Sequence, residues 1–260
     1  MFFEVQDLTK TYIHNGHRFA AVDHLSFSLS PGEILAVAGE SGSGKSTLCR
    51  LICQFARADS GHIFFHDQDI THVPEKERKN LYHHIQMVFQ HPYRSFHPRF
   101  TLEKSILAGI HNYHIPCTPE MLRHHMEEVH LTRDLIRRYP HEVSGGECQR
   151  AALLRTYLFS GSVALLDEPF SALDMLTKKS VHDWYLKVMD EIHLSTLFIT
   201  HDIDEAILLS DRIYLLTGRP GRITEELIIK ETKPRDRDFG LTAEFLEYKR
   251  HILKHLERTV

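Results

Sequence analysis

Residues 39–47 constrain the fold of this chain more than any other stretch, because they match the pattern G-x-x-x-x-G-K-[ST] of a phosphate-binding loop. The apolar run 34–38 before them has the length and composition of a buried strand. The apolar residues after them recur at helical spacing: Leu48, Leu51, Ile52 and Phe55. We therefore predict a strand, a glycine-rich loop and a helix that ends near Asp59. A glycine turn without a ligand is the alternative, and the flanking elements argue against it.

The residue types of this loop indicate how it would hold a nucleoside triphosphate. Glycines let backbone N–H groups close around phosphate oxygens, and the N-terminus of the next helix adds favourable partial charge. Lys45 is expected to reach the outer phosphates and the Ser46 hydroxyl to bind Mg²⁺. The predicted nucleotide-binding residues of the loop are Gly39, Ser41, Gly42, Ser43, Gly44, Lys45, Ser46 and Thr47.

Two other predicted strands end in polar residues that could take part in nucleotide chemistry. The apolar run 163–166 is followed by Asp167 and Glu168. After a phosphate-binding loop, the Asp is expected to hold Mg²⁺ through its water shell and the Glu to polarise an attacking water, although acidic residues also commonly open a loop. His201 follows the run 196–200, at the strand end where ligands bind in open parallel sheets. A lone histidine there is more often structural, so both interpretations stay open.

Two further segments offer groups for a nucleotide. Ser144 is a favourable N-cap, and Gly145 and Gly146 would expose backbone amides at a helix start, as a second anion-binding end. An ordinary glycine-assisted helix cap is the alternative. Tyr12, which follows the first predicted strand, could stack on a purine base or be a half-buried surface aromatic.

The order of the elements predicts an α/β protein with an inserted helical segment. Further strands are expected at residues 2–6, 18–29, 63–65 and 85–89, and further helices at 74–84 and from 175 to about 192. After a proline-bounded loop at residues 91–98, helical spacing dominates from 101 to 158. This change of pattern predicts a helical subdomain of about residues 91–158 between two sheet-forming halves.

The end of the chain differs in composition and in residue spacing from the residues before it. The run 230–238 is rich in charge, and apolar residues from Leu241 onward recur at helical spacing. We predict a core over residues 1–225 and a C-terminal extension over 226–260 that ATP binding does not require. Its amphipathic helix either packs on its own domain or binds a partner.

The composition argues against several classes of protein. Lys+Arg 31 against Asp+Glu 35 give a net charge of −4, whereas a nucleic-acid-binding domain would carry a basic footprint. No apolar run approaches the roughly 18 residues that cross a bilayer, and the first residues lack the pattern of a signal peptide. The four cysteines lack zinc-ligand spacing, so reduced thiols are expected. A metal site built from the 21 histidines is one interpretation, but they lack nearby cysteine or carboxylate partners at a recurring spacing, so solvated surface side chains are favoured.

In this order the motifs resemble those of the ATP-binding cassette (ABC) ATPases. The matches are 39–47 to Walker A, Gln90 to the Q-loop, 143–149 to the signature LSGGQ-x-Q, 163–168 to Walker B, 171–174 to the D-loop, His201 to the switch histidine and Tyr12 to the adenine-stacking aromatic. Val143 replaces the Leu of the signature, and Glu147 replaces its first Gln. The resemblance covers residues 1 to about 225. It implies a P-loop NTPase core with a mainly parallel sheet flanked by helices, an antiparallel N-terminal β subdomain and an inserted α-helical signature subdomain.

The resemblance implies an ATPase that binds ATP and Mg²⁺ between two chains arranged head to tail. The implied catalytic residues are Glu168, His201, Gln90 and Lys45, and the implied Mg²⁺ ligands are Ser46, Gln90 and Asp167. The residues implied to reach the ATP of the other chain are Ser144, Gly145, Gly146 and Asp174. Because each motif occurs once, two chains are needed, either two copies of this chain or this chain with a related one.

Two branches of the family compete. The front half, in residues 39–44 and 87–99, resembles the peptide/nickel importer ATPases, with departures at His91, Arg94, Phe96 and His97. The back half resembles the nitrate/sulfonate/taurine importer ATPases in residues 138–141, 167–174, 200–206, 218–223 and 234–237. Both branches imply the import of a small solute.

Import implies partners that this chain does not contain. They are a transmembrane permease that docks near residues 90–99, a second ATPase subunit, and an extracytoplasmic solute-binding protein that acts through the permease. In that docking loop Tyr93 and Arg94 are expected to face outward, while Phe96 is either interface or core. The chain would then be peripheral, on the cytoplasmic face of the membrane. An export or lipid-extraction ABC ATPase and a soluble non-transport ABC protein are the alternatives.

Overall fold

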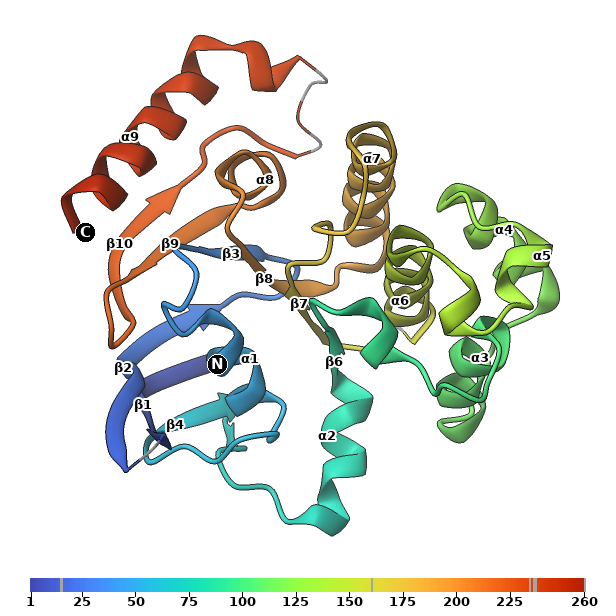
Figure 1. The fold of residues 1–260 in the computed structure, drawn as a ribbon, viewed down its shortest axis with the longest axis horizontal. Coiled ribbons are helices and arrows are strands. Elements are labelled where there is room, and N and C mark those ends of the chain that lie inside the picture. Colours follow the sequence, from blue (N-terminus) through green and yellow to red (C-terminus); the bar gives the residue numbers. More distant parts are fainter. Residues whose placement is uncertain (15, 160, 234, 236–237, 260) are drawn as a thin grey trace. The chain divides into compact units, whose positions relative to one another are not determined.

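The structure is a computed structural model that describes residues 1–14, 16–159, 161–233, 235 and 238–259. The chain forms two compact units (Figure 1). The first unit combines residues 1–82 with 195–260, and the second consists of His83–Leu194. The first unit therefore contains the phosphate-binding loop, and the second contains the Q-loop, signature and Walker B segments.

The first unit contains an antiparallel sheet in the strand order β2-β1-β4-β5. Its strands are β1 (Phe3–His14), β2 (His17–Leu29), β4 (Ser60–Phe65) and β5 (Gln68–Asp69). In β2 the side chains of Leu25, Phe27 and Leu29 are buried and the polar residues between them are exposed, as the alternation in the sequence predicts. The first strand is longer than the predicted 2–6, because it pairs with β2 as far as His14.

A second set of strands in this unit, in the order β10-β9-β3-β8, carries the phosphate-binding loop. They are β3 (Ile34–Ala38), β8 (Ser195–Thr200), β9 (Arg212–Thr217) and β10 (Arg222–Ile228). β3 pairs in parallel with β8 and β9, and β10 pairs antiparallel with β9. Every residue of β3 and β8 is buried, as expected of parallel strands covered on both faces. The strands predicted at 34–38 and 196–200 are confirmed.

The helix after the phosphate-binding loop is shorter than predicted. α1 spans Lys45–Ile52, and the prediction that it continues to about Asp59 is wrong. Gln54 takes a left-handed conformation with φ 60, and the N–H of Phe55 donates to the carbonyl of Arg50 at 2.8 Å. With the Gln54 N–H donating to Leu51, these bonds form a Schellman motif, which terminates the helix. Phe55 is consequently 53% exposed and lies outside the helix.

The remaining helices of the first unit flank the second set of strands or lead out of the unit. They are η1 (Glu75–Glu77), α2 (Arg78–His84), which continues into the second unit, α8 (Ile203–Leu209), η4 (Phe239–Leu241) and α9 (Ala243–Thr259). α9 packs on α8 and β9 within this unit, and its residues Phe245 and Ile252 are buried (Figure 1). The boundary predicted at residue 225 falls inside β10. Pro234, Asp236 and Arg237 of the charged run lie outside the described residues.

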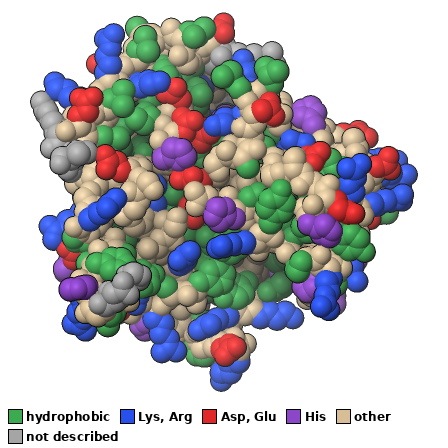
Figure 2. Space-filling view, viewed as in Figure 1, with side chains coloured by type: hydrophobic (Ala, Val, Ile, Leu, Met, Phe, Trp, Pro, Cys, Tyr) green, Lys and Arg blue, Asp and Glu red, His purple; other side chains and the backbone are tan. Residues whose placement is uncertain are grey.

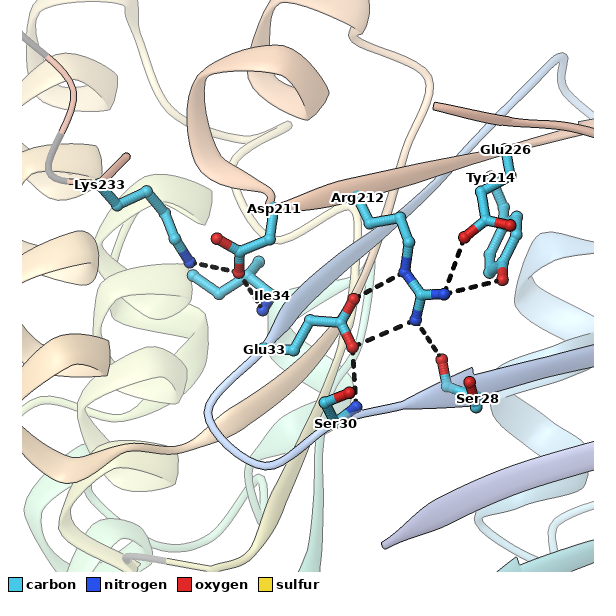
Figure 3. A network of polar contacts seen from close by, with 9 residues as sticks. All are labelled: Ser28, Ser30, Glu33, Ile34, Asp211, Arg212, Tyr214, Glu226 and Lys233. Atoms are coloured by element: carbon cyan, nitrogen blue, oxygen red, sulfur yellow. Dashed lines mark hydrogen bonds and ion pairs between the residues drawn. The ribbon is translucent and has the colours of Figure 1, made fainter. Parts of the chain in front are cut away.

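A polar network joins the start of the C-terminal segment to the strands of the first unit (Figure 3). The guanidinium of Arg212 donates to both carboxylate oxygens of Glu33 and to Glu226 in β10. Asp211 accepts from the backbone N–H of Ile34 and from the ammonium of Lys233 at 2.7 Å. Although burial alone would lower it, these carboxylates raise the pKa of Arg212 well above its usual value. The network therefore ties residues 226 and 233 to β3 and β9.

The second unit is mostly helical. β6 (Ile85–Val88) pairs in parallel with β7 (Val163–Asp167). The helices are η2 (Pro92–Ser95), α3 (Leu102–Asn112), α4 (Pro119–Glu128), α5 (Arg133–Ile136), η3 (Pro140–Glu142), α6 (Gly145–Phe159) and α7 (Met175–Ile192). Thr101, Thr118 and Thr132 cap α3, α4 and α5 through their hydroxyls. The helical pattern predicted from 101 to 158 is confirmed. None of the helices in the described part of the chain combines the length and apolar composition that a bilayer crossing needs.

Candidate nucleotide site

The phosphate-binding loop connects β3 to α1 in a conformation that requires glycine. Gly42 and Gly44 have φ values of 83 and 95, in the left-handed region. A Cβ on Gly44 would lie 2.3 Å from the carbonyl oxygen of Ala21, and one on Gly39 would lie 2.0 Å from that of Leu216. The loop is thus packed against neighbouring backbone, and the glycine pattern of the sequence is explained by this close approach.

Lys45 is the first residue of α1, and its side chain lies across the loop. Its side chain is buried, and Nζ donates to the carbonyl oxygens of Gly39 at 2.7 Å and Glu40 at 2.6 Å. These bonds hold the ammonium at the centre of the loop that the sequence predicts to bind phosphates. A phosphate would offer stronger, charged acceptors than these carbonyls.

Two further predicted residues of the first unit are exposed or half-buried. His201 follows β8 directly and is exposed, and the next residue, Asp202, caps α8 by accepting from the N–H groups of Asp204 and Glu205. Tyr12 is half-buried and forms a cross-strand pair with Phe19, with ring centroids 5.8 Å apart. Sequence reasoning missed Phe19, which is 49% exposed. Its only sequence signal was an aromatic in a predicted strand.

In the second unit, the Walker B and Q-loop residues meet. Asp167 is the buried last residue of β7, and Glu168 follows it with φ 49, a left-handed conformation that is uncommon outside glycine. The amide of Gln90 donates from Nε2 to Oε2 of Glu168 at 3.0 Å. The structure thus brings together two of the residues that the sequence predicts to be catalytic.

The signature segment forms a capped helix start. Ser144 Oγ accepts from the N–H of Glu147, and Glu147 Oε2 accepts from the N–H of Ser144 at 2.7 Å. This reciprocal capping box confirms Ser144 as the N-cap of α6. The hydrogen bond from Ser144 also holds the pKa of Glu147 below its usual value, so the carboxylate is ionised at neutral pH. A Cβ on Gly146 would lie 3.1 Å from the carbonyl oxygen of Ala172, which places the signature beside the D-loop.

The D-loop leads into α7 and is followed by exposed apolar residues. Asp174 caps α7 by accepting from the N–H of Thr177 at 3.1 Å, and this bond holds the pKa of Asp174 below its usual value. Met175 and Leu176 are 86% and 84% exposed. Sequence reasoning missed both, although their position at the start of an amphipathic helix could have drawn attention to them. Two neighbouring exposed apolar side chains of this kind favour a contact with another chain.

The loop after Gln90 divides into exposed and buried parts. Tyr93 and Arg94 in η2 are exposed, as predicted. The Tyr93 hydroxyl donates to the carbonyl oxygen of Val143 at 3.1 Å, so the loop is tied to the first residue of the signature. Phe96 is buried, with the guanidinium of Arg155 over its ring at 5.1 Å, and belongs to the core of the second unit.

Histidines are spread over the surface, but not all are solvated without partners. Figure 2 shows exposed histidine side chains at several separate places. Several have carboxylate partners, at separations along the chain that differ from one pair to the next. His125 contacts Glu128 at 2.8 Å, and His251 and His255 both contact Glu225. The two contacts with Glu225 join α9 to β10. The sequence could not show them, because the partners are 26 and 30 residues apart.

Comparison with known proteins gives a family match that agrees with this geometry. The family model described as ABC transporter matches residues 22–171. A sulfate/thiosulfate import ATP-binding protein of Nitrosomonas europaea is 37% identical over 86% of this chain, which spans 60% of that relative's length. A nitrate import ATP-binding protein of Synechocystis is 33% identical over 97% of this chain and 94% of its own length.

A solved structure matches as well. It is described as the dimeric post-hydrolysis state of an ATP-binding cassette bound to ADP and Pi, and it is 25% identical to this chain. The match covers 89% of this chain and 100% of that one, with a TM-score of 0.78. The predicted fold class, a P-loop NTPase core with parallel and antiparallel sheets, is confirmed.

Proposed function

The chain belongs to the ABC transporter family as an ATPase subunit, and from this premise we propose that it energises a membrane importer of a small solute. Relatives that match most of this chain are named import ATP-binding proteins for sulfate/thiosulfate and for nitrate, and another is named an oligopeptide transport ATP-binding protein. The nitrate relative carries most weight, because the match extends over nearly the whole of both chains. The solute itself is recognised by other chains.

We propose that two copies of this chain bind two ATP molecules between them. Each chain would bind the phosphates of one ATP molecule with its loop 39–47. It would bind the phosphates of the other ATP molecule with the start of α6, at Ser144, Gly145 and Gly146. The exposed pair Met175 and Leu176, beside the D-loop, supports a contact with a second chain. Asp174 would take part in that contact. The alternative to two identical copies is a heterodimer of this chain with a related ATPase.

The residues proposed to hold Mg²⁺ have suitable donors. Ser46 offers a hydroxyl, Asp167 a carboxylate and Gln90 an amide oxygen, and Mg²⁺ prefers such hard oxygen ligands. When bound with the nucleotide, the ion would supply positive charge to neutralise the β- and γ-phosphates. Lys45 would share that role through its ammonium group.

We propose that Glu168 is the general base. Its carboxylate would accept the proton of the water that attacks the γ-phosphorus, as the new O–P bond forms and the bond to ADP breaks. Gln90 already donates to Glu168 Oε2 and would orient it, and His201 would contact the γ-phosphate side of the nucleotide. Tyr12 would stack on the adenine. This contact between Gln90 and Glu168 is the observation that carries the catalytic assignment.

The Glu168→Gln variant tests this assignment. We expect turnover to fall on the order of 10²–10⁴-fold, because an amide cannot accept the proton of the water. ATP should still bind, and the variant should accumulate as an ATP-bound dimer in size-exclusion chromatography. As a comparison, Lys45→Ala should lose ATP affinity in calorimetry, because the phosphates lose their cationic partner. A Glu168→Gln enzyme with normal turnover would show that another residue is the base.

The import assignment needs a separate experiment, which uses the native membrane. We propose that the chain is peripheral on the cytoplasmic face and docks on a permease through residues 90–99, while an extracytoplasmic solute-binding protein delivers the solute. Affinity purification from gently solubilised native membranes should recover a multi-spanning subunit and such a binding protein. Recovery of a membrane subunit without a binding protein would favour an exporter, and recovery of neither would favour a soluble ABC protein.

A further inference from the structure

A group of potential metal ligands lies at the C-terminal end of α4, outside the proposed nucleotide site. His125 Nδ1 is 2.8 Å from Glu128 Oε2, and His124 Nε2 is 3.8 Å from Glu128 Oε1. One ligand atom from each of the three residues lies within 4.8 Å of the others. The spacing H-H-x-x-E places the carboxylate three and four residues after the imidazoles, so that one turn of the helix presents all three.

Two of the three groups are held in place by other helices of the same unit. The side chains of His125 and Glu128 are only 12% and 17% exposed. His125 Nε2 is 3.1 Å from the hydroxyl of Tyr157 in α6, with the rings edge to face. Glu128 Oε1 accepts from the ammonium of Lys187 in α7 at 2.9 Å. His124 is 66% exposed and leaves the group open to solvent.

We propose that His124, His125 and Glu128 form a binding site for one divalent transition-metal ion, with Zn²⁺ as the preferred ion and water in the fourth position. Two imidazoles and one carboxylate suit a borderline cation better than Mg²⁺ or Ca²⁺, which take oxygen ligands. In a tetrahedral zinc site with bonds of about 2.0–2.1 Å, neighbouring ligand atoms are about 3.4 Å apart. The distances from the two imidazoles to the Glu128 carboxylate, 2.8 and 3.8 Å, lie on either side of this value, and the three ligand atoms lie within 4.8 Å of one another.

The surroundings supply the second layer of contacts that such sites use. With the metal on Nδ1 of His125, its Nε2–H can donate to the Tyr157 hydroxyl, which fixes the tautomer and the orientation of the ring. Glu128 is held from α7 by the ammonium of Lys187, which donates to its Oε1 at 2.9 Å, and this contact orients the carboxylate.

Lys187 is the competitor of the metal, and it has an alternative partner. Its ammonium also lies 3.9 Å from Glu191, one turn further along α7, and its side chain is 58% exposed. A metal ion on Glu128 would repel the ammonium toward Glu191. The present link from α4 to α7 through Lys187 would then be lost, while the existing contact of His125 with Tyr157 would keep α4 joined to α6.

The test is a Zn²⁺ titration of the full chain, prepared without a histidine tag and followed by calorimetry. We expect one tight site, and a loss of affinity of at least about tenfold in His124→Ala and in His125→Ala. Tyr157→Phe, which keeps the packing and removes the hydroxyl, should weaken binding by about tenfold. Lys187→Gln should tighten binding, because it removes the competing charge. His111→Ala, an exposed histidine of α3, is the matched control and should leave the affinity unchanged.

A spectroscopic measurement identifies the ligands directly. Cu²⁺ bound to the same chain should show coupling to two imidazole nitrogens in its electron paramagnetic resonance spectrum, and to one in His124→Ala. His124 is exposed, so this variant should fold, which circular dichroism would verify. Unchanged Zn²⁺ affinity in His124→Ala, or weaker binding in Lys187→Gln, would overturn the proposal. These measurements do not involve ATP, so they are independent of the proposed transport function.

Discussion

At the scale of single residues, Glu147 is the departure from the family's signature pattern that has the clearest physical consequence. The family pattern has a neutral glutamine there, whereas this chain has an ionised carboxylate within the capping box of α6. The start of α6 is the end that we propose to bind the phosphates of the second chain's ATP. A negative charge beside it opposes that binding while it stabilises the helix start.

The Glu147→Gln variant separates these two effects. Glutamine can retain the capping box, so the fold should be unchanged, while the ATP-dependent dimer should be favoured about fivefold through the loss of about 1 kcal/mol of repulsion. Dimerisation in the Glu168→Gln background, measured by analytical ultracentrifugation, checks this. Glu142→Gln is the matched control, because Glu142 caps η3 through the same kind of bond to Tyr139 but lies outside the signature. An equal effect of both variants would contradict the explanation.

At the scale of elements, η2 joins the proposed docking surface to the signature segment. Tyr93 and Arg94 are exposed, Phe96 is buried under Arg155, and the Tyr93 hydroxyl bonds to Val143. A partner helix that moves η2 would therefore act on the residue that precedes Ser144. Aromatic and arginine side chains are also favoured anchors at protein interfaces.

The double variant Tyr93→Ala, Arg94→Ala is expected to retain the basal ATPase activity of the isolated chain and to lose assembly with the permease or coupled transport. Tyr93→Phe keeps the ring and removes only the hydrogen bond to Val143. We expect this variant to assemble normally, because docking is proposed to depend on the ring and not on the hydroxyl. Co-purification and uptake assays measure these outcomes. Normal assembly and transport in the double variant, or loss of its basal hydrolysis, would refute the docking assignment.

At the scale of the whole chain, the C-terminal segment closes the first unit. The guanidinium of Arg235 donates to the carbonyl oxygens of Leu208 and Ser210 at 2.7 Å, where α8 ends, and Ile252 of α9 is fully buried. Cations at a helix C-terminus are stabilising, and burial of α9 adds apolar contact area. From the structure we therefore expect truncation after Lys230 to destabilise the first unit, contrary to the dispensable extension expected from the sequence.

Two neighbouring residues of α9 test this docking. Ile252→Ala should lower the free energy of unfolding by about 2–4 kcal/mol, because it leaves a cavity at a fully buried position. Leu253→Ala removes a side chain that is 41% exposed and should cost less than about 1 kcal/mol. Urea unfolding of the full chain, followed by circular dichroism, compares the two. Similar shifts in both variants would show that α9 does not dock as described.

The sequence by itself determined the local elements and the chemistry of the loop. The pattern of residues 39–47 and the apolar runs 34–38, 163–166 and 196–200 predicted a phosphate-binding loop between strand and helix and further buried strands, all of which the structure contains. Such patterns succeed because spacing along the chain sets which side chains share a face of a strand or helix. The cap at Ser144 was likewise readable, since both partners lie within four residues.

Only the tertiary structure decided how distant residues meet. The end of α1 depended on the left-handed conformation of Gln54, a position where the sequence has no glycine to indicate a helix end. The environment of buried Phe96 includes Arg155, 59 positions away. The contacts of Gln90 with Glu168, and of His125 with Tyr157, join residues 78 and 32 positions apart. No local spacing encodes such contacts, because they arise when separate elements pack together and bury their apolar faces.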